Sequence, residues 1–477
     1  MKRHLLRNLA LLAIILLISI VPFLNTITAG FSYRTSIINN ISQNDMRGPH
    51  MFDLLIISPY QFIDELQLLV SHKERMGVST RLVSLCDIYD QMYWQGRDEA
   101  EKIKYFIKEA IEQWGTKYIL LVGGKMGQLP LWYCPVRYVH MQCDWEAEFI
   151  SDLYFADIYD ENGNFSSWDS DGDGIFGEWY FQQYAEDQDI DLTPDVAVGR
   201  LPCRYEFEVT VMVDKIIKYE TLTSDQPWFR DFTVFAGDTY PVSYNPNWTG
   251  YEGEYYGDLA IDNMPGFQPY RYYTSDGTLT GYKDVRQAIN KGCGFAYFVG
   301  HGSPSSWGNH PPDSDVFIDG LHVYNVFLFL NFYKLPVCVI SGCHNLQFDV
   351  DIFNVFNKTK RWRCEATFES IGWRLTRKIL GGSIATIGTS ALGFTKEDKD
   401  SFSGGINEIE VEFFNQYGNE EKEILGDAFN GAIEWYVETY PINWNTSSTE
   451  DSWIDTQVVQ SWTLFGDPSL KIGGYSQ

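Results

Sequence analysis

The chain has 477 residues, of which 44% are hydrophobic and 16% aromatic, and it carries a formal net charge of −28. A chain of this length and composition can bury a large core, which excludes global disorder and suits two α/β units. The acidity argues against nucleic-acid binding, because no Lys/Arg run long enough to follow a phosphate backbone appears after the N-terminus. The eight cysteines form no CxxC pair, so a zinc ribbon is not indicated.

Residues 1–29 have the layout of a secretory signal. Positive charge between Lys2 and Arg7 precedes an apolar run from Leu9 to Leu24, and small residues follow up to Ala29. This pattern predicts a secreted, extracellular protein. If the segment stayed uncleaved, it would tether the protein to the outer cell surface, and only then do we expect membrane contact. Residues 30–51 are polar and irregular, which is typical of a linker.

Residues 52–228 are expected to form a first α/β unit, in which short apolar runs alternate with amphipathic stretches. This alternation predicts a doubly wound, parallel sheet flanked by helices. The expected elements are strands at 52–58, 79–84, 117–124 and 194–199, and helices at 62–75, 97–114 and 205–220.

The irregular stretch from about residue 132 to 192 contains an acidic loop with the spacing of a cation site. Alternating carboxylates can face one centre, and Gly174 permits the tight turn that this requires. The loop departs from an EF-hand, because its Glu stands at the tenth position and no clear helix pair flanks it. We expect a structural Ca²⁺ loop, with an unliganded acidic loop as the alternative; the candidate ligands are Asp169, Asp171, Asp173, the Ile175 carbonyl and Glu178.

Residues 229–477 are expected to form a second, catalytic α/β unit. A final turn and strand at 462–470 is expected to close this unit. Its other expected elements are strands at 232–236, 294–299, 336–341 and 382–387, and helices at 283–290, 365–380, 404–417 and 424–438.

Two of these strands end in residues that carry chemistry. The run Gly294–Val299 leads into Gly300-His301-Gly302, and the run Pro336–Ile340 leads into Ser341-Gly342-Cys343. Functional sites of open α/β sheets gather at the carboxyl ends of strands, so both residues are expected at one site. An imidazole beside a thiol favours the thiolate and can then protonate a leaving amine. The sequence therefore predicts His301 as catalytic base and Cys343 as nucleophile.

The backbone amides of Gly302 and Cys343 are the natural donors to an oxyanion, because they flank the position of an attacked carbonyl. Cys338 lies inside its apolar strand and is expected in the core. His344 is a weaker candidate base than His301, since neighbouring side chains point apart on an extended segment.

The chain resembles the gingipain-type cysteine peptidases of the caspase-like clan, over roughly residues 52–472. The matching motifs are Gly300-His301-Gly302-Ser303 with Trp307, Ser341-Gly342-Cys343, Pro194 to Arg200 with the following helix to Glu220, Lys73 to Gly77, and Leu464 to Ser469. The resemblance implies two side-by-side α/β subdomains with mainly parallel sheets flanked by helices, and peptide hydrolysis through an acyl-enzyme on Cys343.

The resemblance also implies roles that the residues alone do not fix. An acidic residue that orients the catalytic His matches Asp238 best, although Glu is expected at that position. Glu252 and Glu254 are expected in a loop, Tyr251–Tyr255, where an acidic residue would favour Arg or Lys at P1; two exposed loop carboxylates without that role are the open alternative. Trp307 is carried over as a third candidate for substrate binding.

We therefore expect a secreted cysteine endopeptidase that acts on protein or peptide substrates, with Ca²⁺ as a structural ion and no organic cofactor. Two alternatives stay open at this point. One is a non-catalytic, calcium-stabilised surface protein with the same fold. The other is a transpeptidase or sorting enzyme that transfers the acyl group to an amine through the same Cys–His pair.

Overall fold

The computed structural model describes residues 51–476 except 143–144, 181–182, 189, 242–249, 399–400 and 448–450. The predicted signal segment and nearly all of the predicted linker lie outside these residues. Within the described chain, no helix is long and apolar enough to cross a bilayer.

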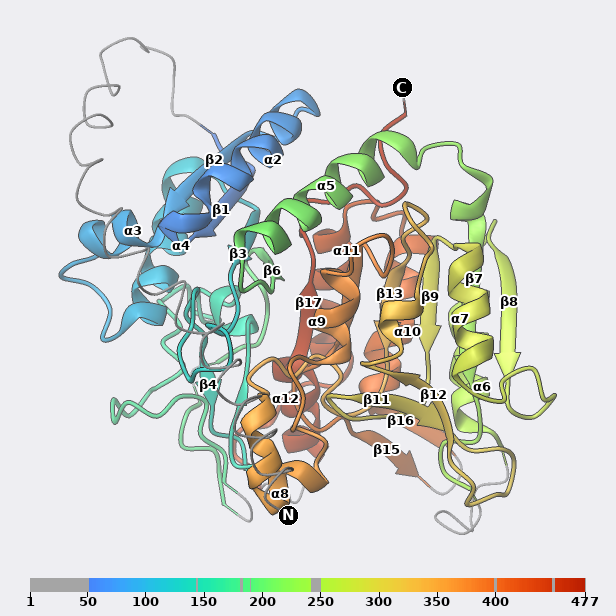
Figure 1. Cartoon of the computed structure of the whole chain (residues 1–477). Helices are drawn as coiled ribbons and strands as arrows, with labels where there is room; N and C mark the ends of the chain where they lie inside the picture. The colour runs from blue at the N-terminus through green and yellow to red at the C-terminus, as the bar shows by residue number, and fades with distance from the viewer. Residues whose placement is uncertain are drawn as a thin grey trace, which may run out of the picture.

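One ten-stranded sheet runs through the whole molecule (Figure 1). Strands such as Leu54–Ser58 are buried along their full length, as expected for strands covered by helices on both faces. In spatial order the strands are β2 (Thr80–Ser84), β1 (Leu54–Ser58), β3 (Tyr118–Val122), β6 (Ala197–Leu201), β17 (Trp462–Phe465), β14 (Ala385–Thr389), β13 (Val337–Ile340), β9 (Phe295–Phe298), β7 (Asp231–Ala236) and β8 (Gln268–Tyr273).

The sheet changes direction once, between β17 and β14. Strand β17 pairs antiparallel with β14 but parallel with β6, and every other neighbouring pair in the sheet is parallel. The two halves of the sheet therefore run in opposite directions. The expected final strand is confirmed, but it does not close the second unit: it lies at the centre of the sheet and runs with the N-terminal half.

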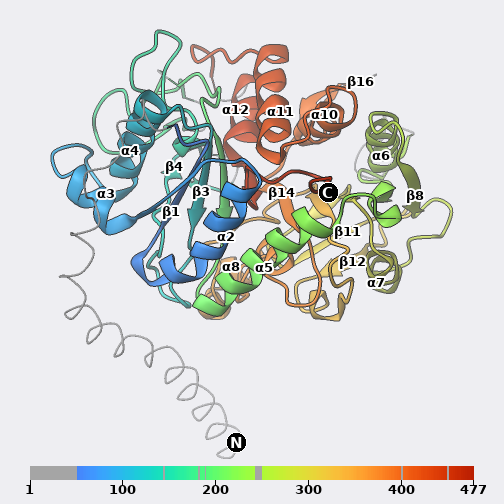
Figure 2. The ribbon, with the colours of Figure 1, turned by 90° about the horizontal axis from the view of Figure 1, so that it is seen from above.

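Helices cover both faces of the sheet (Figure 2). Helices α4 (Glu99–Trp114), α12 (Asp451–Ser461), α11 (Leu425–Thr439), α10 (Ile406–Gly418) and α6 (Glu252–Asp262) lie on one face. Helices α2 (Ile63–Arg75), α5 (Glu206–Leu222) and α7 (Tyr282–Lys291) lie on the other. The remaining helices are α3 (Leu85–Gln91), α8 (Lys358–Trp362), α9 (Ile371–Thr376) and the 3₁₀ turns η2 (Tyr60–Phe62), η3 (Leu153–Phe155), η4 (Pro227–Arg230), η5 (Val326–Leu328) and η6 (Ile352–Phe356).

Short strands build three small sheets beside the large one. Strands β10 (His301–Gly302), β11 (Ser306–Asn309) and β12 (Ile318–His322) form an antiparallel sheet directly after β9. The others are the pair β4 (Tyr138–Val139) with β5 (Phe149–Ile150) and the pair β15 (Thr395–Asp398) with β16 (Ser401–Gly405).

Two expectations about helices were wrong. The helix expected over 365–380 is reduced to α9, because Arg204 donates to the Phe368 carbonyl and to Glu369 and so fixes the preceding residues outside the helix. The stretch around Glu252, expected as a loop, is instead the first turn of α6.

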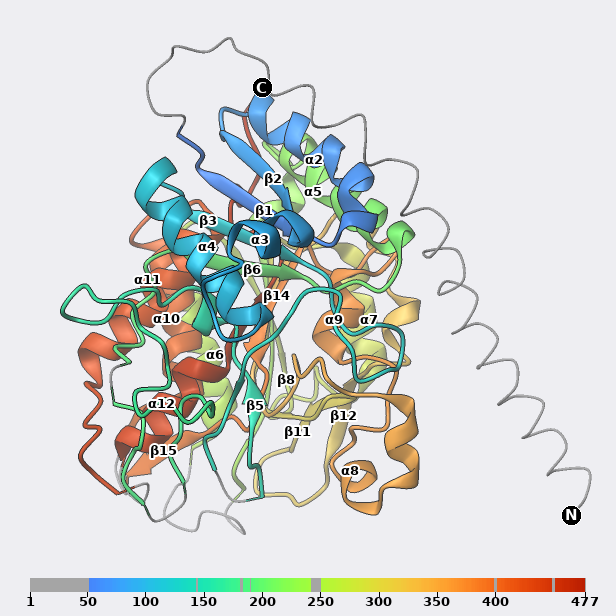
Figure 3. The same cartoon turned by 90° about the vertical axis from the view of Figure 1, so that its left-hand side faces the viewer.

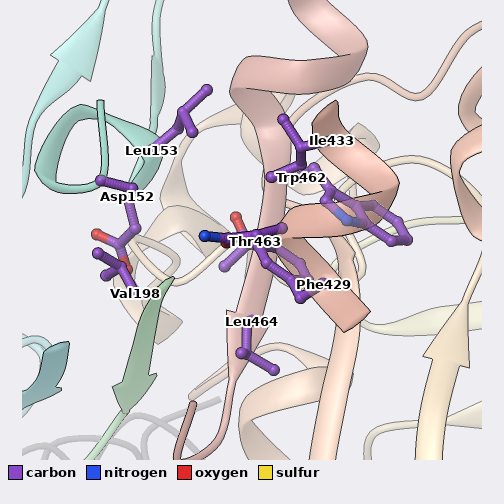
Figure 4. Close-up of a pocket in the computed structure, with 10 residues that line it drawn as sticks. Asp152, Leu153, Val198, Phe429, Ile433, Trp462, Thr463 and Leu464 are labelled. Atoms are coloured by element: carbon purple, nitrogen blue, oxygen red, sulfur yellow. The ribbon is translucent and has the colours of Figure 1, made fainter. Parts of the chain in front are cut away.

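Buried charge lies on β6, the strand that pairs with β17 in the N-terminal half of the sheet. Arg200 on β6 is fully buried and forms two 2.7 Å hydrogen bonds with the carboxylate of Asp152. A small pocket opens beside this ion pair, between β6 and the start of β17, with Asp152 and Val198 on one side and Trp462 on the other (Figure 4). Neither predicted catalytic residue lines this pocket, so we assign it no catalytic role.

A second buried cluster joins both ends of the chain. Lys73 on α2 lies 2.8 Å from a carboxylate oxygen of Glu220 on α5 and 2.8 Å from one of Asp467, just after β17. Lys73 also donates to the Ser469 carbonyl. Burial alone lowers the pKa of Lys73, but the two carboxylates outweigh it and raise that pKa above its usual value. Three of the sequence motifs named above thus meet in one ion cluster.

Replacement of Lys73 by Met should destabilise the fold by about 3–5 kcal/mol, because it removes the lysine cation that faces the buried carboxylates of Glu220 and Asp467. Urea denaturation measures the loss, and Lys283→Met, an exposed lysine on α7, is the control. The loss should shrink in acid, where protonation removes the uncompensated charge. Equal stabilities of the two variants would contradict this role.

Candidate active site

His301 and Cys343 meet at the carboxyl ends of neighbouring strands. Strands β9 and β13 are parallel partners, with Phe298 opposite Ile340. Beyond them the two backbones touch: a Cβ on Gly342 would lie 2.4 Å from the Gly302 nitrogen, and Gly342 has φ +108°. Only glycine suits that conformation and that gap. The glycines that flank the two residues therefore bring their backbones into contact.

The His301 ring is oriented by a backbone carbonyl. Its Nε2 lies 2.7 Å from the Thr239 carbonyl oxygen, which accepts a hydrogen bond. This bond fixes the proton on Nε2 and leaves the lone pair on Nδ1, the atom that can take a proton from a thiol. Burial, together with the nearby His310, lowers the pKa of His301, although the Thr239 carbonyl opposes the shift. The imidazole is therefore neutral at neutral pH.

Cys343 is partly exposed, and its thiol donates to the Gly393 carbonyl at 3.7 Å. Loss of hydration raises the pKa of the thiol to about 11, and the charge of Glu146 adds to this rise. Together with the lowered His301 pKa, this makes the resting pair a neutral thiol and a neutral imidazole. The proton must then move as the sulfur attacks, and not before.

The turn that carries Cys343 is anchored from the other half of the molecule. Glu146, between β4 and β5, accepts a hydrogen bond from the Leu392 amide at 3.0 Å and lies 3.6 Å from the ring of His344. His344 adopts a left-handed φ of +61°, and its ring stacks on Trp145. Burial raises the pKa of Glu146 to about 8 and lowers that of His344 to about 3. His344 is thus a buried, neutral ring. Glu146 was not predicted from the sequence.

The structure does not place Asp238 on the His301 imidazole. Its carboxylate accepts from the Asp313 amide at 2.7 Å and hydrogen-bonds the carboxyl of Glu252. Strand-like pairing with His310 turns Asp238 in this direction. Burial raises the pKa of both carboxyls, that of Glu252 to about 8, so one of them holds a proton at neutral pH. Asp238 therefore supports the Thr239 backbone and leaves the ring contact to that carbonyl.

The three candidates for substrate binding are also buried. Glu252 is 2% and Glu254 8% exposed. Glu252 accepts from the Tyr240 amide, and Glu254 accepts from the amide and hydroxyl of Ser275. The ring of Trp307 is fully buried against Phe298. These contacts correct the expectation that the three side chains face a substrate, because each is taken up by the protein interior.

The acidic loop gathers its carboxylates, and Glu186, which sequence reasoning missed, joins them. Oxygen atoms of Asp169, Asp171 and Asp173 lie within 4.8 Å of one another, and so do those of Asp171, Glu178 and Glu186. Glu178 is buried, and its Oε2 has no hydrogen-bond partner among the described residues. These hard oxygen donors fit a Ca²⁺ ion.

Not every predicted ligand is equally free for a cation. Asp169 pairs with Arg97 and accepts from the amides of Gly172 and Gly174, so it mainly shapes the loop. The Ile175 amide donates to Asp173 at 2.7 Å. The role of the Ile175 carbonyl as a ligand stays a prediction. A cation would therefore rely most on Asp171, Glu178 and Glu186.

A mainly parallel sheet covered by helices on both faces, with a reversal near its centre, is the fold of a caspase-like cysteine peptidase. The model of peptidase family C25 matches residues 49–473, and the chain belongs to this family of gingipain-type peptidases.

Solved structures agree on the fold. The Arg-specific cysteine proteinase gingipain R (RgpB) superposes with a TM-score of 0.59 at 18% identity, over 90% of this chain and 80% of that one. The complex of the RgpB pro- and mature domains from Porphyromonas gingivalis superposes with a TM-score of 0.58 at 18% identity, over 88% of this chain and 79% of that one.

An uncharacterized protein of Archaeoglobus fulgidus is 25% identical over 289 residues, 56% of this chain; the match spans 64% of that relative's length.

Replacement of Glu146 by Gln should make Cys343 more reactive in alkali. Above its pKa of about 8 the Glu146 carboxylate opposes formation of a thiolate, and Gln removes that charge. We expect alkylation of Cys343 by iodoacetamide to be roughly two- to tenfold faster in this range and unchanged at lower pH. Peptide-resolved mass spectrometry gives the rates.

The more exposed Glu148 provides the matched control, because Glu148→Gln removes a neighbouring carboxylate outside this contact. Superimposable pH profiles for Glu146→Gln and the unaltered chain would show that Glu146 does not act on the thiol.

Proposed function

We propose that the protein is a secreted or cell-surface cysteine endopeptidase that hydrolyses peptide bonds through an acyl-enzyme on Cys343. The observation that carries this proposal is the direct contact between the His301-Gly302 and Gly342-Cys343 backbones, with the His301 ring held by the Thr239 carbonyl. Export is supported by the signal-like residues 1–29.

The geometry suits acyl transfer with proton movement during attack. The Cys343 sulfur attacks the scissile carbonyl carbon while His301 Nδ1 takes the thiol proton. The amides of Gly302 and Cys343 are the proposed donors to the oxyanion. The imidazolium then protonates the leaving amine, which departs and leaves a thioester on Cys343. His301 next removes a proton from water, and the water oxygen attacks the thioester to release the acid and restore the thiol.

Substrate preference is not assigned to Glu252 or Glu254. A P1 Arg or Lys would need an accessible carboxylate, and both of these are buried and hydrogen-bonded. The Arg specificity of gingipain R belongs to that protein. A basic P1 preference in this chain would have to come from other residues.

We further propose a structural Ca²⁺ ion in the acidic loop. The buried Glu178 carboxylate supports this proposal, because its Oε2 atom has no hydrogen-bond partner among the described residues. Burying such an oxygen costs free energy, and a bound cation would offset that cost. The ion supplies charge neutralisation to the long segment between β5 and β6 and takes no part in the peptide chemistry.

The activity is tested on a mixed fluorogenic peptide library with a thiol reductant and Ca²⁺ present. Cys343→Ala should abolish turnover, and His301→Ala should lower kcat/KM by about 10²–10⁴-fold. The acid limb of the parent's kcat/KM profile should lie below pH 6.5, because the folded-state pKa of His301 is lowered and its neutral form persists further into acid.

Cys86→Ala removes an exposed thiol elsewhere and should leave turnover unchanged. No cleavage by the folded, Ca²⁺-loaded parent would contradict hydrolysis. Product formation that requires an added amine would instead indicate a transpeptidase.

Chelation of Ca²⁺ should lower the melting temperature of the full chain. Saturation at about a hundred times Kd stabilises a protein by roughly 2.7 kcal/mol, and this is the gain that chelation removes. In the double variant Asp171→Asn with Glu186→Gln the melting temperature should no longer respond to Ca²⁺. Asp262→Asn, an exposed acid on α6, is the control that should still respond. If the melting temperature of the unaltered chain did not change with Ca²⁺, the loop would not bind the ion.

A further inference from the structure

Residues 352–363, which comprise η6 and α8, form a projection that exposes apolar side chains. The two short helical segments pack against each other at the edge of the molecule (Figures 1 and 3). Phe356 is 79% and Trp362 75% exposed, and Phe353 and Val355 are also exposed. Such side chains are normally buried, so their gathering on one projection is a feature that needs an explanation.

The same projection is basic, in a chain whose net charge is −28. Four cations stand within six residues, at Lys358, Lys360, Arg361 and Arg363. The first three are exposed, and Lys360 has one loose ion pair, 3.8 Å from Glu365. The nearby Asp351 is neutralised by Lys125 at 3.0 Å. The exposed face of the projection is therefore positive and apolar at once.

The projection is firmly attached to the body of the protein. Asn357 accepts hydrogen bonds from the amides of Thr359 and Lys360 and so caps α8. Arg363 donates to the Trp145 carbonyl at 3.1 Å and lies over the Trp145 ring. Ordered aromatic and basic side chains are thus presented outward on a fixed base.

We propose that residues 352–363 dock the protein on an anionic lipid surface. Trp and Phe side chains are favoured at the depth of lipid headgroups, and Lys and Arg gain about 1 kcal/mol each beside an anionic leaflet. The positive charge complements anionic headgroups, while the acidity of the rest of the chain keeps its other faces away from them.

A lipid surface fits this projection better than an acidic protein or a nucleic acid. The rings of Phe356 and Trp362 are the most exposed of the projection, and exposed rings of this kind can insert between lipid headgroups. A protein partner would need a matching groove of its own. Nucleic-acid binding would also meet repulsion from the net charge of −28, and the basic run is too short to follow a phosphate backbone.

Docking would orient the active site, an extension that rests on the proposed peptidase function. Helix α8 lies at the same end of the molecule as β11 and β12, the small sheet that continues from His301 (Figures 1 and 3). Bound through residues 352–363, the enzyme would turn this end towards the bilayer. Its substrates would then be peptide segments close to a lipid surface.

The test uses the full-length chain with vesicles of phosphatidylcholine alone or with added phosphatidylglycerol. Hydrogen exchange of residues 352–363 should slow on the anionic vesicles and not on the neutral ones. This local readout is chosen because the apolar run near the N-terminus can hold the chain on vesicles by itself. Combined Lys358→Gln, Lys360→Gln and Arg361→Gln should weaken this protection roughly a hundredfold in lipid concentration.

Phe356→Ser with Trp362→Ser should also remove the protection. Trp94→Ala is the matched control, because Trp94 is 91% exposed on a different surface. Unchanged exchange on anionic vesicles, or equal protection in the triple variant, would overturn the proposal. So would tighter capture of a polyglutamate peptide or an oligonucleotide by the same residues. The measurement is repeated in Cys343→Ala, so that docking is judged independently of catalysis.

Discussion

The structure depends on the buried ion cluster of Lys73, Glu220 and Asp467. The sheet reverses direction at β17, and the pairing of β17 with β6 centres on Phe465 and Arg200. So narrow a junction needs support from beyond the strands themselves. Lys73 supplies it by binding α2 and α5 to the chain just after β17. Full burial makes the cluster costly to break, and it therefore fixes the residues after β17 against α2 and α5.

Backbone carbonyls, and not side chains, hold the His301 ring and the Cys343 thiol in place. The Thr239 carbonyl that orients His301 stands between two anchored amides: that of Asp238, which pairs with His310, and that of Tyr240, which donates to Glu252. On the other side, Glu146 anchors the loop before Gly393, whose carbonyl receives the Cys343 thiol. The His301 ring and the Cys343 thiol are thus each held by a backbone carbonyl, and the residue next to each carbonyl donates its amide to a buried carboxyl group.

Sequence reasoning succeeded where the signal was local. Strands buried on both faces read as short apolar runs, so β1, β9 and β13 and the residues at their ends could be found. It failed where burial is decided by distant partners. Glu252 and Trp307 were predicted as site residues, but packing of α6 and of the core buries both side chains. Glu146 lies nearly two hundred residues before Cys343 in the chain, and no local pattern marks it. The central position of β17 was missed for the same reason.

That central position has a consequence for synthesis. Strand β17 comes from residues 462–465, after every other strand of the sheet in chain order. A growing chain therefore exposes the edges of β6 and β14 until this last strand inserts between them. The Lys73 cluster cannot form before Asp467 has emerged either. Assembly of the sheet thus waits until residues 462–467 have been synthesised, so this fold cannot be completed strand by strand as the chain grows.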